Sequence, residues 1–452
     1  MSISRFPLVL LPAVLLAAPA TLSDAYKEPA ARIITAALAD KDGYAKLSYL
    51  CDRIGNRLSG SPALNEAIQW AAAQMQRDGL ENVTIQPVKV PHWVRGREEA
   101  AILKPVSHPL TMLALGGSVA TPPEGITAEV VPVSSFDALN ALGRDRIAGK
   151  IVLFNVPYEG YGKTVTYRAA GPSRAAKLGA AAMLVRSVGS LAMQTPHTGA
   201  LQYTEADPKI PAAAITFEDA TMIQRLADAG ETVTVRLYME AHMEPDADSA
   251  NVFGEITGRE KPDEIVVMGG HIDSWDVGAG AQDDGSGIIA SLEAVALIKK
   301  LGLQPRRTLR VVFWTNEENG GAGGRAYRAA VGGKIGNYVA AIEMDGGAEK
   351  PVGFGIGKGG PALERAQQIG RLLESIGADT VREGGGGADI EPVMQDGVPG
   401  LGLFTVGLHY FDWHHTRTDT VDKVDPEDFR KCTAAMAVMG YVLADMPQRL
   451  GE

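Results

Sequence analysis

Cysteine is nearly absent from this sequence, which has only Cys51 and Cys432 among 452 residues. An oxidising compartment would permit a disulfide between these two residues. Two buried free thiols fit equally well, because the sequence does not fix the distance between them. Both alternatives stay open from the sequence alone.

Basic runs are also missing, and aromatic residues make up only 6% of the chain. The net charge is -11 and the pI is near 5.3. These values exclude nucleic acid and other polyanions as partners. Hydrophobic residues at 45% and charged residues at 21% provide a large core and exclude a disordered chain.

Long hydrophobic runs are absent after the N-terminus, so we expect no membrane anchor. The first 20 residues combine Arg5, a mainly apolar stretch from Phe6 to Ala18, and an Ala18-Pro-Ala20 site. This pattern is typical of a signal peptide removed after Ala20 or Ala25. We therefore expect an exported protein, periplasmic or extracellular.

The chain contains a spaced set of acidic residues and histidines that are candidate metal ligands. They are His271-Ile-Asp273, Asp283-Asp284, Glu317-Glu318, Asp345 and His414-His415. Neutral imidazole and carboxylate, with no thiolate, suit a hard or borderline metal. Five candidate ligands and one spare carboxylate exceed what one closed zinc site needs, and they favour a two-metal hydrolytic site.

Most of these residues follow a strand-like apolar run. The runs are 264–268, 308–314 and 338–342, which precede His271, Glu317-Glu318 and Asp345. Ligands gather at the carboxyl ends of strands in open α/β sheets. Asp283 instead opens a helix-like segment, with Asp284 and Ser286 as candidate N-caps. One crevice is therefore predicted.

The chain is predicted to be an α/β protein, with a mixed, mostly parallel sheet flanked by helices and one inserted domain. Residues from about 120 to 240 contain none of the candidate ligands, and His242 to Ser249 is expected to be a polar return linker. The expected divisions are a signal peptide (1–20), the first part of the catalytic domain (26–118), the inserted domain (119–243) and the second part (244–452).

The order of the motifs resembles the co-catalytic zinc aminopeptidase family. The matching motifs are His271-Ile-Asp273, Ala281-Gln-Asp283-Asp284-Gly-Ser-Gly287, Asn316-Glu317-Glu318, Asp345 and His415-Thr-Arg-Thr-Asp419-Thr420. Arg57-Leu-Ser-Gly-Ser61 is similar to the carboxypeptidase Q branch of that family, and Ala148 to Thr216 resembles the protease-associated domain that this subgroup inserts. The implied fold is a zinc-peptidase fold.

The resemblance also implies two Zn²⁺ ions per chain. Asp283 is the expected bridging ligand. His271 with Asp345 is expected on one ion, and Glu318 with His415 on the other. His414 stands beside His415, but the spacing to the later Asp-Thr pair favours His415.

Three further residues receive roles from the resemblance. Glu317 is the expected general base, Asp273 is expected to hold His271 from outside the metal shell, and Tyr410 is a candidate for oxyanion stabilisation. Some family members place an arginine in the loop matching 386–389, where it reads the substrate terminus. Here that loop reads Gly386-Gly387-Ala388-Asp389 and has no arginine, so terminal specificity does not carry over.

The expected function is an exported dizinc metallo-exopeptidase that cuts unblocked dipeptides or short peptides. The alternatives are a zinc aminopeptidase on longer peptides, an acyl transferase similar to glutaminyl cyclase, and a non-catalytic binding scaffold. The scaffold reading requires lost ligands, and none are lost here. The resemblance implies a homodimer, and the expected partner is a short peptide substrate.

Overall fold

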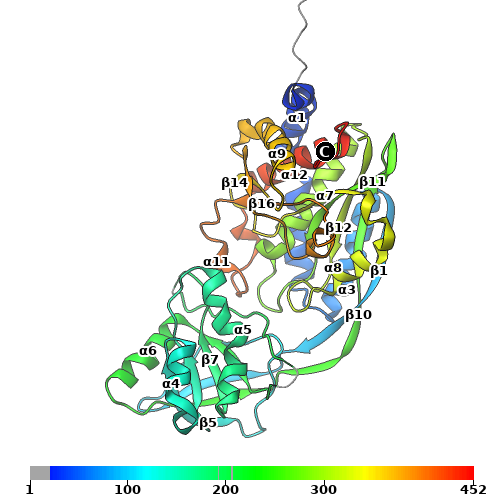
Figure 1. Cartoon of the computed structure of the whole chain (residues 1–452). Coiled ribbons are helices and arrows are strands. Elements are labelled where there is room, and N and C mark those ends of the chain that lie inside the picture. The colour runs from blue at the N-terminus through cyan, green and yellow to red at the C-terminus, as the bar shows by residue number, and fades with distance from the viewer. Residues whose placement is uncertain (1–20, 192, 205–206) are drawn as a thin grey trace, which may run out of the picture.

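The structure is a computed structural model that describes residues 21–191, 193–204 and 207–452 (Figure 1). The expected signal peptide at 1–20 lies outside these residues. Within the described residues, no helix is both long and apolar enough to cross a membrane.

Two eight-stranded sheets organise the chain, and the first carries most of the predicted strands. Its order is β1-β10-β12-β11-β13-β16-β14-β15, with four parallel and three antiparallel neighbour pairs. The strands are β1 (Glu81–Val94), β10 (His242–Ile256), β11 (Lys261–His271), β12 (Arg307–Trp314), β13 (Tyr338–Glu343), β14 (Pro351–Ile356), β15 (Thr380–Glu383) and β16 (Gly400–Thr405). The mixed α/β fold expected from the sequence is confirmed.

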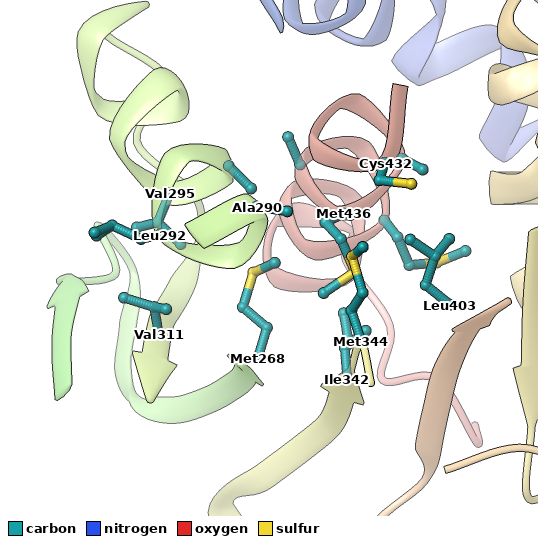
Figure 2. Close-up of a cluster of buried hydrophobic side chains, with 14 of the residues drawn as sticks. Met268, Ala290, Leu292, Val295, Val311, Ile342, Met344, Leu403, Cys432 and Met436 are labelled. Atoms are coloured by element: carbon teal, nitrogen blue, oxygen red, sulfur yellow. The ribbon is translucent and has the colours of Figure 1, made fainter. Parts of the chain in front are cut away.

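Helices cover both faces of this first sheet. They are α1 (Leu22–Ala39), α2 (Asp42–Tyr49), α3 (Pro62–Arg77), α7 (Ser286–Lys300), α8 (Ala322–Val331), α9 (Pro361–Gly370), α10 (Glu391–Met394), α11 (Tyr410–Trp413) and α12 (Pro426–Asp445). Successive residues of a strand face opposite sides, so Met268 joins the core under α7 and α12 while Val267 joins the core under α8. Figure 2 shows Met268, Val311 and Ile342 pointing from three strands toward α7 and α12.

The second sheet belongs to the inserted part of the chain, and its order is β3-β2-β9-β5-β6-β7-β8-β4. Its strands are β2 (Glu98–Lys104), β3 (His108–Leu110), β4 (Met112–Ala114), β5 (Ile126–Val133), β6 (Ile151–Phe154), β7 (Ala182–Arg186), β8 (Ala212–Ile215) and β9 (Thr234–Met239). Its helices are α4 (Phe136–Ile147), α5 (Tyr161–Lys177) and α6 (Phe217–Asp228). Figure 1 shows these elements gathered below the first sheet, with α5 nearest to α11.

The second sheet begins earlier than the boundary expected at residue 119. β2 pairs with β3 and β9, and β4 pairs with β8, so the chain enters this sheet at Glu98. The expected polar linker at His242 to Ser249 is wrong, because these residues form the first half of β10 and pair with β1. Both segments are short or polar, so their pairing comes from tertiary contacts and not from a local apolar pattern.

Cys51 and Cys432 are both buried free thiols in the structure. Cys432 lies in α12, and its thiol donates to the carbonyl of Glu349 at 3.3 Å. The structure therefore favours the free-thiol alternative over the disulfide.

Candidate functional site

The three central strands end at the same edge of the first sheet. β11 ends in His271, β12 ends three residues before Glu317, and β13 ends two residues before Asp345. β11 is parallel to both β12 and β13, so their carboxyl ends meet. The structure thus brings these predicted site residues into one crevice.

Asp283 lies between two histidines at the centre of that crevice. Its Oδ1 is 3.2 Å from Nε2 of His271, and its Oδ2 is 3.2 Å from Nε2 of His415. Asp283 belongs to the short helical turn η2 (Ala281–Gly285), directly before α7. A carboxylate that presents one oxygen to each of two imidazoles has the arrangement that a bridging ligand needs.

Each histidine also has a carboxylate of its own. Nε2 of His271 lies 3.5 Å from Asp345 Oδ1, and Nε2 of His415 lies 2.9 Å from Glu318 Oε2. His271, Asp283 and Asp345 bring ligand atoms within 4.8 Å of one another, and so do Asp283 and the two adjacent histidines. The four residues that the resemblance pairs as terminal ligands therefore lie in the same pairs in the structure.

His414 also points its Nε2 toward Asp283, at 3.5 Å, and its ring stacks on that of His415 with centroids 3.5 Å apart. Its distance to Asp283 is longer than that of His415, and only His415 also contacts Glu318. The geometry therefore favours His415 as the ligand and puts His414 on the wall of the site.

Backbone carbonyls fix the tautomer of both candidate ligand histidines, His271 and His415. Nδ1 of His271 donates to the carbonyl of Asp273 at 2.9 Å, and Nδ1 of His415 donates to the carbonyl of Thr198 at 3.3 Å. A neutral imidazole that donates through Nδ1 keeps an unprotonated Nε2 for a metal. Thr198 comes from the inserted part of the chain, and sequence reasoning did not identify it.

Several buried atoms of this cluster need a cation between them. Among the described residues, His271 Nε2, Asp283 Oδ2, Glu318 Oε1 and Asp345 Oδ1 have no hydrogen-bond partner. Because Nδ1 carries the proton in His271 and His415, the lone pair of each Nε2 faces the lone pairs of the neighbouring carboxylates. This arrangement is repulsive unless a positive ion lies between them. These nitrogen and oxygen donors therefore fit divalent zinc.

The electrostatics of the cluster indicate the same shortage of positive charge. Burial raises the pKa of Glu317 well above its ordinary value and that of Glu318 to about 7. Burial disfavours protonation of His271, but the carboxylates of Asp283 and Asp345 outweigh it and raise its pKa well above the usual range. Divalent cations would remove the need for these protons.

Asp273 contacts His271 through its backbone carbonyl, and its carboxylate makes other contacts. Its carboxylate Oδ1 is 3.9 Å from His271 Nδ1 and instead accepts the backbone N–H of Glu317 at 3.1 Å. The other oxygen accepts the N–H of Glu318 at 3.3 Å. The backbone carbonyl of Asp273 orients His271, and its side chain fixes the turn that carries both glutamates.

Two further buried residues hold the loops around Asp283. Asp419 accepts the backbone N–H of Gln282 at 2.8 Å and that of Asp283 at 3.2 Å. The guanidinium of Arg57 donates to the carbonyls of Ile272, Ala279 and Gly280 at 2.7, 2.8 and 3.0 Å.

Asp284, one candidate N-cap, accepts the N–H of Gly287 at 3.1 Å. Ser286 is the first residue of α7 and does not cap it.

Glu317 stands beside the ligands and keeps contact with solvent. Its Oε2 is 4.0 Å from Nε2 of His271, and its side chain is 23% exposed. It lines a cavity of about 300 Å³ together with Asp283, Glu318, Asp345, Tyr410, Phe411, both adjacent histidines and, from the inserted part, Tyr161 and Arg168. A free carboxylate at the open side of a ligand cluster can move a proton to or from a substrate.

A second cavity of about 300 Å³ adjoins the first on the Asp345 side. It shares Asp345, Tyr410 and Phe411 with the first and is otherwise lined by Gly386, Gly387, Phe404 and their neighbours. Glu343 lies in its wall, and burial raises the pKa of this carboxyl to about 8. The first cavity contains the candidate ligands, and the second extends it past Asp345.

Tyr410 lies where the two cavities meet. Burial, together with the carboxylates of Asp283 and Asp345, raises the pKa of its phenol well above the usual value. The hydroxyl therefore keeps its proton and is available as a hydrogen-bond donor to negative charge that develops in the site.

Comparison with known proteins agrees with this geometry. Residues 251–439 match the model of "Peptidase family M28". Carboxypeptidase Q of Bos taurus is 46% identical over 412 residues, which cover 91% of this chain and 87% of that protein. The crystal structure of a peptidase M28 precursor from Shewanella amazonensis has a TM-score of 0.92 at 33% identity, with 94% of this chain and 98% of that chain covered.

A more distant structure shares the fold. It is BSAP, a zinc aminopeptidase from Bacillus subtilis, with a TM-score of 0.67 at 20% identity, covering 90% of this chain and 96% of that chain.

Proposed function

This chain belongs to peptidase family M28 and is a metallo-exopeptidase, and we propose that it holds two zinc ions and hydrolyses the peptide bond of unblocked dipeptides. The observation that carries the proposal is Asp283, which has one carboxylate oxygen 3.2 Å from each of two imidazole nitrogens. His271 with Asp345 would complete one ion's ligand set, and His415 with Glu318 the other.

The side chains around these ligands supply the remaining chemistry. Bound zinc supplies a Lewis acid for the scissile carbonyl and activates water. Glu317 accepts the proton of the attacking water and passes it to the leaving amine, since it is the acid of the cluster that is not needed as a ligand. Tyr410 donates a hydrogen bond to the oxyanion. Asp273 holds Glu317 in place because its carboxylate accepts the backbone N–H of Glu317.

The size and charge of the site support a short substrate with a free amine. Glu317 and Asp345 offer carboxylates to a terminal ammonium, and each of the two cavities has a volume of about 300 Å³. That volume is at the lower end of the range for ligand pockets, so the site suits a short substrate. The relatives named carboxypeptidase Q share 44–46% identity with this chain.

A panel of dipeptides tests the proposal. Free, N-acetylated and C-amidated forms of one dipeptide are incubated with the purified protein, and zinc is counted by elemental analysis. We expect two zinc ions per chain, rapid cleavage of the free dipeptide and a large loss of kcat/KM on N-acetylation. Equal cleavage of blocked dipeptides and long chains would contradict the exopeptidase reading.

A tripeptide labelled at each end separates the aminopeptidase alternative. Release of the first residue marks an aminopeptidase, and release of the last residue marks a carboxypeptidase. For a dipeptide both directions cut the same bond, so the dipeptide panel stands independently of this result.

Export and a homodimer complete the proposal. Export is supported by the signal pattern in residues 1–20, and the homodimer by the family resemblance. Mass photometry or sedimentation of the purified protein measures directly whether it is a dimer.

A further inference from the structure

Glu343 is a buried carboxyl in the wall of the second cavity, and it has no part in the proposed metal set or mechanism. It is the last residue of β13 and is 1% exposed. The N–H of Met344 donates to the carbonyl of Gly269 at 3.2 Å, so the chain continues beside β11 past Glu343. Met344 joins the core under α7 and α12 (Figure 2), so Glu343 and Asp345 lie on the opposite side of this segment. Both of them line the second cavity.

The carboxyl of Glu343 has one oxygen in use and one free. Its Oε2 accepts the backbone N–H of Ile390 at 3.0 Å. Among the described residues, its buried Oε1 has no hydrogen-bond partner. A buried acceptor in this state lacks a donor, which a ligand in the cavity can supply. The carboxyl keeps the capacity to accept that hydrogen bond whether it is protonated or ionised.

A glycine in the facing loop makes room for this carboxyl. A Cβ on Gly387 would lie 2.0 Å from both the carboxyl carbon and Oε1 of Glu343. Any side chain at position 387 would therefore displace the carboxyl or the loop. Gly386 and Gly387 line the same cavity as Glu343. The loop thus approaches the free oxygen as closely as only glycine permits.

The rest of the second cavity combines apolar walls with negative charge. Leu403, Phe404 and Phe411 provide apolar surface. Of the described residues that line this cavity, Glu343 and Asp345 are acidic and none is basic. An apolar wall beside a buried carboxyl suits a long side chain with a cationic end, because its stem packs on the wall while its charged head reaches the acid.

We propose that the second cavity binds the side chain of the substrate's N-terminal residue and that Glu343 makes the enzyme prefer lysine and arginine at this position. This inference rests on the proposed function. In that function the substrate amine lies near Glu317 and Asp345, and the scissile carbonyl lies at the metal ligands. The N-terminal side chain therefore begins beside Asp345, where the second cavity extends from the first.

The separation of Asp345 and Glu343 suits a long side chain. Two residues of extended chain span about 6.6 Å. The lysine side chain carries its ammonium at the end of a long flexible stem, which can cover a distance of this order. A short side chain, such as that of alanine or serine, would end near Asp345 and leave Oε1 of Glu343 without a donor. The preference therefore depends on both the length and the charge of the side chain.

The test compares lysyl-alanine with norleucyl-alanine, which has the same carbon stem without the ammonium. In the wild type we expect kcat/KM to be about 10- to 100-fold higher for lysyl-alanine, because a buried hydrogen bond to a charged group contributes a factor of this size. Glu343→Gln should lower kcat/KM on lysyl-alanine by a similar factor and change norleucyl-alanine little. Glu383→Gln alters an exposed carboxylate of β15 in the same sheet and should leave both substrates unchanged.

Two results would contradict the inference while leaving the proposed function intact. One is a wild type that cuts both dipeptides equally well, and the other is an equal loss on both dipeptides in Glu343→Gln with unchanged zinc content. A wild type that hydrolyses neither dipeptide would contradict the proposed function and this inference together.

Product inhibition of the wild type gives the same comparison without any variant. Free lysine and free norleucine are the N-terminal products of the two dipeptides, and each is measured as a competitive inhibitor. We expect lysine to inhibit at a concentration about 10-fold lower than norleucine. Equal inhibition by the two amino acids would contradict the role of Glu343.

Discussion

The carbonyl oxygen of Thr198 lies 3.3 Å from Nδ1 of His415, and the N–H of Thr198 donates to the His415 carbonyl at 3.0 Å. This reciprocal pair joins the inserted part of the chain to a candidate zinc ligand. A group that orients a metal ligand contributes to metal affinity even though it does not touch the metal. The inserted part therefore contacts the candidate metal site and also forms one wall of the cavity.

Removing the inserted part should weaken the binding of one metal ion more than that of the other. Val94 of β1 and His242 of β10 are register partners, so an Asn-Gly turn can replace residues 95–241. We expect zinc affinity at the His415 position to fall about 10- to 100-fold, because its orienting carbonyl is lost. The His271 position keeps the carbonyl of Asp273 and should change less.

Zinc content measured against a graded chelator, with circular dichroism to check the fold, gives the readout for this variant. A shortened protein that binds both ions as tightly as the full chain would show that Thr198 is not needed. The same variant should accept longer peptides, because α5, which lines one side of the cavity, is gone.

The position of the metal cluster could be predicted because its determinants are local. Val266 to Met268 and Val311 to Phe313 are apolar runs that read as buried strands, and acids or a histidine follow directly. Parallel strands place such residues at one sheet edge regardless of the details of packing. This is why the spacing predicted an α/β sheet with these residues gathered at one edge, whereas their division between two ions came from the family resemblance.

The features that sequence reasoning missed leave no local pattern. The carbonyl of Thr198 is a backbone atom, so its residue type carries no signal. Arg168 is one arginine in an Ala-rich helix, and only the docking of α5 on α11 brings it to the cavity. The first half of β10 is polar and exposed on both faces, so its sequence resembles a linker.

Asp283→Asn should impair both metal positions, because Asp283 is the residue that contacts both ligand histidines. We expect elemental analysis to find fewer than two tightly bound zinc ions and activity to fall with them. Asp284→Asn is the neighbouring control, because Asp284 accepts the backbone N–H of His271 and of Gly287 and should affect stability more than zinc content. Two tightly held ions in Asp283→Asn would defeat the bridging assignment.

Glu264 provides a pH-dependent contribution to stability far from the active site. Burial works to raise its pKa, but hydrogen bonds from Arg307 and Arg449 outweigh burial and lower the pKa from 4.5 to about 2. A folded-state pKa below the unfolded value stabilises the protein above about pH 4.5 and loses that effect as the pH falls toward 2.

Glu264→Gln should therefore lower the free energy of unfolding at pH 7 by about 1–3 kcal/mol. The difference from wild type should narrow as the pH falls from 4.5 toward 2. Denaturant unfolding at pH 7, 5 and 3.5 measures this difference in the free energy of unfolding. Glu124→Gln, which alters an exposed carboxylate, is the control. A destabilisation of the same size at every pH would mean that the carboxylate's charge is not its cause.

Glu317 and Glu318 are adjacent acids with different expected roles, and replacing each by glutamine separates them. Oε2 of Glu318 is 2.9 Å from the ligand nitrogen of His415, whereas Glu317 is 4.0 Å from His271 and partly exposed. Glu317→Gln should keep its zinc and its fold but lose at least about 100-fold in kcat/KM, because the amide cannot accept the proton of the attacking water. Glu318→Gln should lose zinc together with activity, because an amide oxygen is a weaker ligand than a carboxylate. Elemental analysis and dipeptide turnover on both variants measure the two effects, and near-normal turnover in Glu317→Gln would mean that another group is the base.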